Sequence, residues 1–171
     1  MGQQGNFGYK LPEAIRGEIG STSINIIRTG TATADIDFGK VVELTYRTQT
    51  DIDLYGPNGV REYTDLLDSG LPLLGVAVYV PSSSNGKKTQ YKYLTDTSVA
   101  IMTRGDVYVE VTQGSLCLMG DPCYLAKFGP TWVVTDQVTA RRVGTFAETK
   151  EATADNSILI HFDSKIPQLG P

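Results

Sequence analysis

Residues 106–112 constrain the fold of this 171-residue chain more than any other segment. Valine alternates there with larger or polar residues: Val107, Val109 and Val111 against Tyr108, Glu110 and Thr112. Successive side chains of a β-strand point to opposite faces. The spacing therefore predicts a strand whose valines face a core while the other three side chains face outward.

Short runs of β-branched and aromatic residues recur along the rest of the chain, separated by glycine, proline and serine turns. They predict further strands at residues 24–27, 38–46, 74–80, 91–94, 116–118, 124–126, 133–134, 138–139, 143–146 and 158–162. Only residues 61–69 indicate a short helix, which Gly70 would end. Many short strands with almost no helical periodicity predict an all-β fold, a single β-sandwich or barrel of jelly-roll-like type.

The first 23 residues differ in composition from the rest of the chain. They are rich in glycine, glutamine and serine and contain Pro12. We interpret residues 1–23 as an extended N-terminal arm and residues 24–171 as one β-rich domain, because a chain of this length supports one core. A disordered terminus is the alternative, and the two interpretations differ in whether a partner surface orders the arm.

The charge balance argues against two classes of partner. The 15 Lys and Arg residues are outnumbered by 19 Asp and Glu residues, a formal net charge of -4. A dedicated nucleic-acid binder normally carries a basic excess, and a membrane span needs about 18 consecutive apolar residues, which the sequence lacks. We therefore expect no nucleic-acid and no membrane partner. The N-terminus has no basic start followed by an apolar stretch, so we expect synthesis in a cytoplasm.

The residue types that support catalysis are scarce. His161 is the only histidine, and it lies in an apolar strand pattern where it should face away from Ile160 and Phe162. The sequence contains neither a Gly-x-Ser-x-Gly elbow nor a phosphate-binding glycine loop. We therefore expect no enzyme activity, no catalytic residue and no cofactor.

Two other groups of residues have some features of a metal or redox site. Residues 51–62 match a calcium loop at some positions, but Tyr55 stands where Asp or Asn is required, so we expect a solvated loop. Cys117 and Cys123 flank a Gly120-Asp121-Pro122 turn. Buried, reduced thiols are the first interpretation, a disulfide formed after release from the cell is the second, and a zinc site lacks further ligands.

Several motifs follow one another in a characteristic order. They are Arg16-Gly17-Glu18-Ile19-Gly20, residues 34–42 with Phe38-Gly39 before a valine strand, Gly75-Val76-Ala77-Val78-Tyr79, residues 104–109, Gly120-Asp121-Pro122-Cys123-Tyr124 and residues 158–162. In this order and spacing the chain resembles the structural cement (capsid decoration) proteins of tailed bacteriophages. Residues 58–74 and 82–88 show no family pattern.

The resemblance implies a protein made in the host cytoplasm that becomes part of the virion. It would bind the outer surface of the expanded head as a homotrimer and clamp neighbouring subunits of the major capsid protein. Tyrosines on strands and apolar residues of the arm are the candidate contacts with the capsid or another protomer, although strands favour tyrosine in any case. The candidate interface residues are Phe7, Tyr9, Leu11, Ile15, Arg16, Tyr79, Tyr91 and Tyr93.

Two other functions are consistent with a β-rich chain. One is a different virion component, in the tail or neck. The other is a carbohydrate-binding β-sandwich, which should present several tryptophan and tyrosine platforms, yet Trp132 is the only tryptophan.

Overall fold

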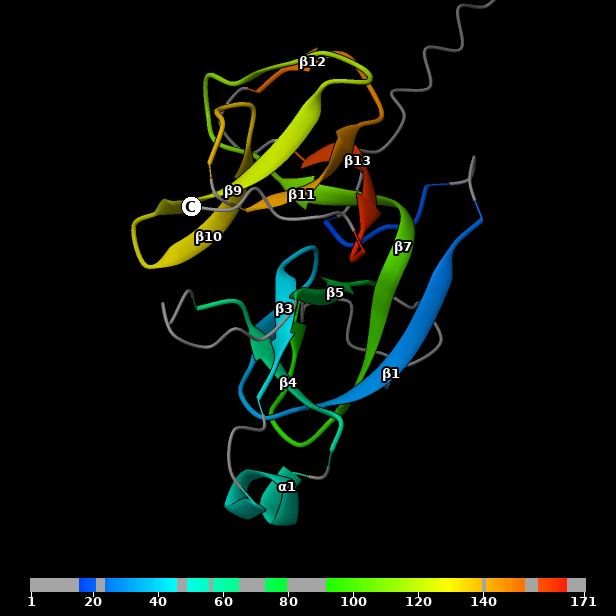
Figure 1. Cartoon of the computed structure of the whole chain (residues 1–171), viewed down its shortest axis with the longest axis vertical. Helices are drawn as coiled ribbons and strands as arrows, with labels where there is room; N and C mark the ends of the chain where they lie inside the picture. Colours follow the sequence, from blue (N-terminus) through cyan, green and yellow to red (C-terminus); the bar gives the residue numbers. More distant parts are fainter. Residues whose placement is uncertain are drawn as a thin grey trace, which may run out of the picture.

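The computed structural model describes residues 16–20, 24–45, 49–55, 57–64, 73–79, 92–139, 141–152 and 157–165. Strands dominate this part of the chain, with one short helix among them (Figure 1). The elements are β1 (Ile26–Ala32), β2 (Ile36–Asp37), β3 (Val41–Leu44), α1 (Gln49–Tyr55), β4 (Gly59–Glu62), β5 (Leu73–Ala77), β6 (Lys92–Tyr93), β7 (Ser98–Glu110), β8 (Leu116–Cys117), β9 (Pro122–Phe128), β10 (Thr131–Thr135), β11 (Arg142–Phe146), β12 (Lys150–Glu151) and β13 (Ser157–Asp163).

Nine strands form one sheet in the order β1-β4-β3-β5-β7-β13-β11-β9-β10, and β1 also pairs with β7. That additional pairing closes β1, β4, β3, β5 and β7 into a ring, the lower half of Figure 1. Within the ring β1 and β4 run parallel, and the other neighbours are antiparallel. Closure pairs strand edges that an open sheet would expose, although β4 pairs with β1 only at Thr31 and Ala32.

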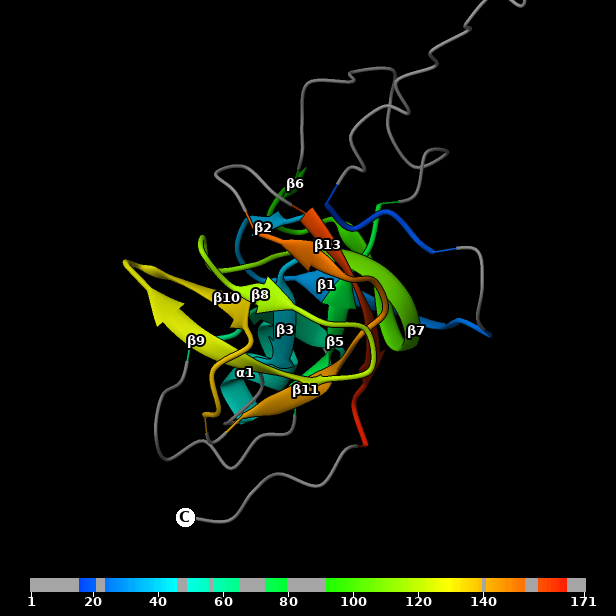
Figure 2. The same cartoon turned by 90° about the horizontal axis from the view of Figure 1, so that it is seen from above.

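The long strand β7 joins this ring to a second group of strands. Its first part pairs with β1, and its second part, from Arg104 to Glu110, pairs with β13. The sheet then continues through β11, β9 and β10 (Figure 1 and, seen from above, Figure 2). An isolated bridge between Val111 and Val134 brings β10 back to the end of β7, and Thr112 N donates to Val134 O at 2.8 Å. The all-β class is confirmed, with a barrel-like closed sheet.

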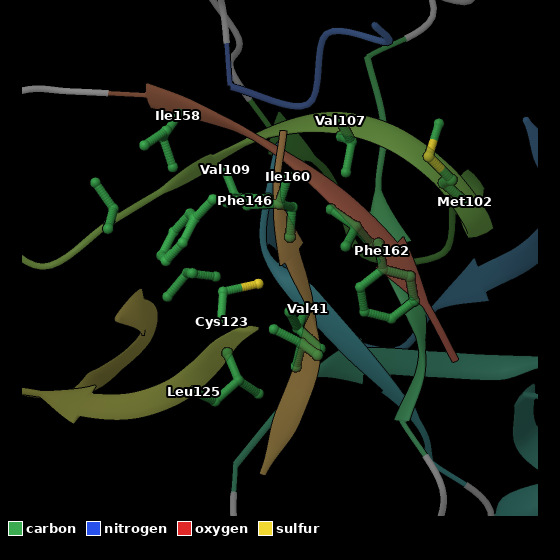
Figure 3. Packing of buried hydrophobic residues seen from close by; sticks show 14 of the residues in the cluster. Val41, Met102, Val107, Val109, Cys123, Leu125, Phe146, Ile158, Ile160 and Phe162 are labelled. Atoms are coloured by element: carbon green, nitrogen blue, oxygen red, sulfur yellow. The ribbon is translucent and has the colours of Figure 1, made fainter. Parts of the chain in front are cut away.

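Two clusters of buried side chains fill the two groups of strands. One cluster lies in the ring and includes Ile36, Val42, Val60 and Ile101. The other gathers β7, β9, β11 and β13 side chains, and Figure 3 shows ten of its members with labels. The predicted valine alternation is confirmed, because the three valines are at most 7% exposed: Val107 0%, Val109 1% and Val111 7%. Burying a side chain of this size stabilises the fold by roughly 1.5–3 kcal/mol.

Three local predictions were wrong. Residues 61 and 62, at the start of the predicted helix, form the end of β4, because Val60 is fully buried and its strand pairs with both β1 and β3. The predicted loop at residues 51–55 instead belongs to α1, where Gln49 Nε2 donates to Asp53 Oδ1 at 2.9 Å one helical turn away. Val138 and Thr139 do not form a strand, and Val138 is 73% exposed.

Of the helices in the described ranges, none combines the length and apolar character needed to cross a membrane.

Candidate subunit-binding surface

Residues 16–20, here called the N-terminal anchor, lie along β7 and belong to the segment predicted as an arm. Gly17 N donates to Tyr108 O at 2.7 Å, and Tyr108 N donates to Glu18 O at 3.0 Å. Because Tyr108 uses both backbone groups in this way, β7 carries the anchor along one edge and β13 along the other. Tyr79 N also donates to Gly17 O at 2.8 Å, which ties the anchor to the end of β5. Whether the preceding residues extend as an arm stays a prediction.

Two glycines make the close approach of the anchor possible. Gly17 and Gly39 have φ of +79° and +77°, in the left-handed region that favours glycine. A Cβ atom on Gly17 would lie 3.0 Å from Gly39 N, and one on Gly39 would lie 3.0 Å from Gly17 N. The anchor therefore packs directly against the Phe38-Gly39 motif.

A small charge network fixes the first residue of the anchor. Arg16 Nη1 lies 3.3 Å from Glu110 Oε2, and Lys40 Nζ lies 2.8 Å from the same oxygen. The Lys40 side chain is only 7% exposed, so this second contact is screened little by solvent. The network holds the start of the anchor against β7.

The other end of the anchor meets β7 at Asp106. Gly20 N donates to Asp106 O at 2.8 Å, and Asp106 N donates to Asn25 Oδ1 at 3.1 Å. Asp106 Oδ1 also lies 2.7 Å from His161 Nδ1 on β13. His161 faces away from the core side chains of its strand, as predicted, and its contact with Asp106 links β13 to β7. Within the described ranges, no three His, Cys, Asp or Glu side chains come together as a metal site.

The structure brings together some of the candidate interface residues. Arg16 is partly exposed beside Glu110, and Tyr79 is half-buried with its ring edge-on to Phe38 at 5.3 Å between centroids. Both lie where the anchor meets β5 and β7. The remaining candidates except Tyr93 lie outside the described residues: Phe7, Tyr9, Leu11, Ile15 and Tyr91.

Tyr93 does not face outward as expected for a contact residue, because its side chain belongs to the core. It is 7% exposed, its hydroxyl donates to Val78 O at 2.6 Å, and its ring packs edge-on against Phe38. Burial raises the pKa of Tyr93 above its ordinary value. The flanking Lys92 and Leu94 are exposed, so the alternation in this strand points the tyrosine inward.

Exposed apolar residues in three places were missed by the sequence reasoning. One group precedes and opens β1, a second lies in β8 and in the two residues after it, and Phe128 stands at the tip of the β9–β10 hairpin with 61% exposure. The adjacent Ile26 and Ile27 carried the signal for the first group, because two successive strand residues cannot both face one core. The two groups are Ile24, Ile26 and Ile27, and Leu116, Leu118 and Met119.

Both cysteines are free and buried in the structure. Burial raises the pKa of Cys117 to about 11 and that of Cys123 to about 12. At neutral pH both side chains are therefore uncharged thiols, which are poor nucleophiles and poor metal ligands.

Comparison with known proteins agrees with this architecture. The family model described as structural cement protein (E217 gp24/Pam3 gp6) matches residues 3–165. A chain in the capsid of Myoviridae phage XM1 has a similar fold, with a TM-score of 0.61, 15% identity, and coverage of 88% of this chain and 91% of that chain. The head fiber gp8.5 N base of bacteriophage phi29 gives a TM-score of 0.48 and 12% identity, with coverage of 86% of this chain and 100% of that one. No curated protein sequence matches the chain.

The family match spans nearly the whole chain, including the anchor, both barrel-like groups of strands and the turn at Gly120. The chain therefore belongs to the phage structural cement protein family.

Proposed function

We propose that this protein binds the outer surface of the expanded phage head and holds neighbouring subunits of the major capsid protein together, without catalysing a reaction. A protein that binds only the expanded lattice stabilises that state by mass action. Many symmetry-related copies add avidity, so each contact can be modest. The family match supports the cement role, and the location on the outer surface is part of the proposal.

The observation that carries the proposal is the N-terminal anchor. Its four backbone hydrogen bonds and the Arg16–Glu110 ion pair attach the segment after residue 15 to β7 and to the end of β5. Force applied to residues 1–15 would therefore be transmitted directly to β7, the longest of the described strands. We infer that these residues contact the capsid or an adjacent protomer through Phe7, Tyr9, Leu11 and Ile15, and that Arg16, Tyr79 and Tyr91 add to the same contact.

The homotrimer is also a proposal. The exposed apolar group Leu116, Leu118 and Met119 supports self-association, because adjacent exposed apolar side chains on a protein surface mark interaction sites. Light scattering of the purified protein would measure the mass of the particle in solution, and measurement of bound copies per capsid would show whether three occupy each threefold position.

Deletion of residues 2–15 tests the role of the arm while leaving the anchor intact. We expect binding to expanded capsids, measured by cosedimentation, to weaken at least about tenfold, since a flexible segment that orders on a partner extends the interface. A matched variant with residues 2–15 replaced by a Gly/Ser sequence of equal length separates the effect of sequence from that of length. Unchanged binding by both variants would contradict the proposal.

A further inference from the structure

The outer edge of β1 is open to a further strand over most of its length. Thr31 N donates to Asn58 O at 2.9 Å, in the direction of β4. Backbone groups point alternately to the two sides of a strand, so those of Ile27 and Thr29 point to the same side. However, β4 pairs with β1 only at Thr31 and Ala32. Within the described ranges, the β1 edge at Ile27 and Thr29 has no neighbouring strand.

The same part of β1 is exposed on both faces. The first four residues of the strand, 26–29, are all exposed, although they pair with β7 along the other edge. Ile26 and Ile27 are each 44% exposed, and Ile24 just before the strand is 86% exposed. Proteins usually protect an open strand edge with charged residues, proline or a covering segment. An open edge with adjacent exposed isoleucines is a site where a further strand can add.

The sequence of this chain contains a segment of suitable pattern. Phe7, Tyr9 and Leu11 occupy every second position, separated by Gly8 and Lys10. In an extended conformation the three large apolar side chains would share one face, as strand addition requires. This segment precedes the anchor and lies outside the described residues.

We propose that residues 7–11 of a neighbouring copy add as a strand to the open edge of β1 at Ile27 and Thr29. The proposal rests on the proposed function, because the capsid surface brings the copies together. It names β1 as the surface that receives the arm and a second copy of this chain as the source of the strand. Each copy would then both give an arm and accept one.

The position of the anchor favours a neighbouring copy over the same chain. The anchor meets β7 at Tyr108, whereas Thr29 pairs with Ala100, eight residues along the strand. Eight strand residues measure about 27 Å along the strand. With Tyr9 or Leu11 opposite Thr29, the seven or five residues that lead to Arg16 reach at most about 25 Å or 18 Å when fully extended. The open edge lies on the far side of β1, so the path within one chain is longer still.

Disulfide trapping between two populations of the protein tests this proposal. One population carries Thr29→Cys, and the other carries Phe7→Cys, Tyr9→Cys or Leu11→Cys. Each of these three variants tests one register, in which that residue of the added strand lies opposite Thr29. The two populations are mixed on expanded capsids under mild oxidant, and cross-linked dimers are measured on non-reducing gels. The native Cys117 and Cys123 are each 0% exposed and contribute no background. We expect a cross-linked dimer from at least one mixture and none from either population alone.

Two charge variants add a matched control. Ile27→Lys places a charge at the open edge, and Val138→Lys adds the same charge at another exposed apolar residue, 73% exposed, in the loop after β10. Introduced into the Thr29→Cys chain, Ile27→Lys should abolish the cross-link, and Val138→Lys should leave it unchanged.

The outcomes separate this inference from the proposed function. Capsid binding without a cross-linked dimer overturns the strand addition and leaves the cement function standing. A cross-link formed only within a single chain carrying both Tyr9→Cys and Thr29→Cys also overturns it, because the arm then folds onto its own domain. Failure of the parent protein to bind capsids overturns both.

Discussion

Gly17 and Gly39 pack against each other, and each leaves no room for a side chain on the other: a Cβ on either would lie 3.0 Å from the other's backbone nitrogen. Both residues also have positive φ. The contact joins the N-terminal anchor to the turn before β3.

Gly17→Ala should therefore destabilise the protein by more than the backbone strain alone. A non-glycine residue at positive φ costs about 1–3 kcal/mol, and the crowding at this site adds to that cost. Gly120→Ala is the control, because Gly120 has φ +92° and open space around its Cβ position. Urea unfolding should show a larger loss of unfolding free energy for Gly17→Ala, and equal losses would show that the packing contributes nothing.

The buried ion pair between Glu43 and Arg61 gives a second prediction. Glu43 is fully buried, and its Oε1 atom accepts from Arg61 Nε and from Thr64 Oγ1, each at 2.9 Å. Arg61→Ala would leave a buried charge without its cation and should cost about 3–5 kcal/mol. Arg104→Ala, at an exposed pair 3.8 Å from Asp163, should cost less than about 1 kcal/mol. Similar losses from the two variants in urea unfolding would contradict the buried pair's importance.

Glu62 should make the stability depend on pH. Burial raises the pKa of Glu62, although Glu62 Oε1 accepts a hydrogen bond from Asp37 N at 2.8 Å. A raised pKa means that the folded state binds this proton more tightly than the unfolded chain does, so the contribution of the group to stability falls as pH rises. Glu62→Gln, which resembles the protonated form, should unfold like the parent near pH 3 and be more stable than the parent near pH 7. A stability difference that is the same at both pH values would contradict this reasoning.

The cysteines should be unreactive in the folded protein. Their pKa values of about 11 and about 12 and their complete burial both oppose thiolate formation and access. Iodoacetamide at pH 8 should modify neither thiol in the native protein and both after unfolding, as counted by mass spectrometry. Rapid modification of either thiol without denaturant, or an unfolded protein that resists alkylation until reduced, would contradict the structure.

Strand positions were predictable where one face of the strand is buried. The alternation in β7 and β13 places Val107, Val109, Ile158 and Ile160 in one core, and the sequence shows this period directly. The closure of the sheet was not predictable, because it depends on β1 pairing with both β4 and β7. Local sequence at residues 59–62 does not reveal that tertiary pairing converts them into a strand.

The candidate surface was predictable in part. Arg16 and the Phe38-Gly39 motif are visible in the sequence, but the contact of Glu110 with both Arg16 and Lys40 joins residues up to 94 positions apart (110 minus 16). The burial of Tyr93 could not be predicted, because alternation along a strand does not show which of its two faces is buried. Only the packing of Phe38 against its ring decides which.

Binding of the purified protein to expanded and unexpanded capsids of the same phage tests the central claim most directly. Cosedimentation at increasing protein concentration would give the occupancy of each form, and cryo-electron microscopy of the bound form would locate the density. We predict saturable binding to the expanded head alone, with density on its outer surface where major capsid subunits meet. Equal binding to both forms, or density only on the tail or neck, would contradict the proposed function.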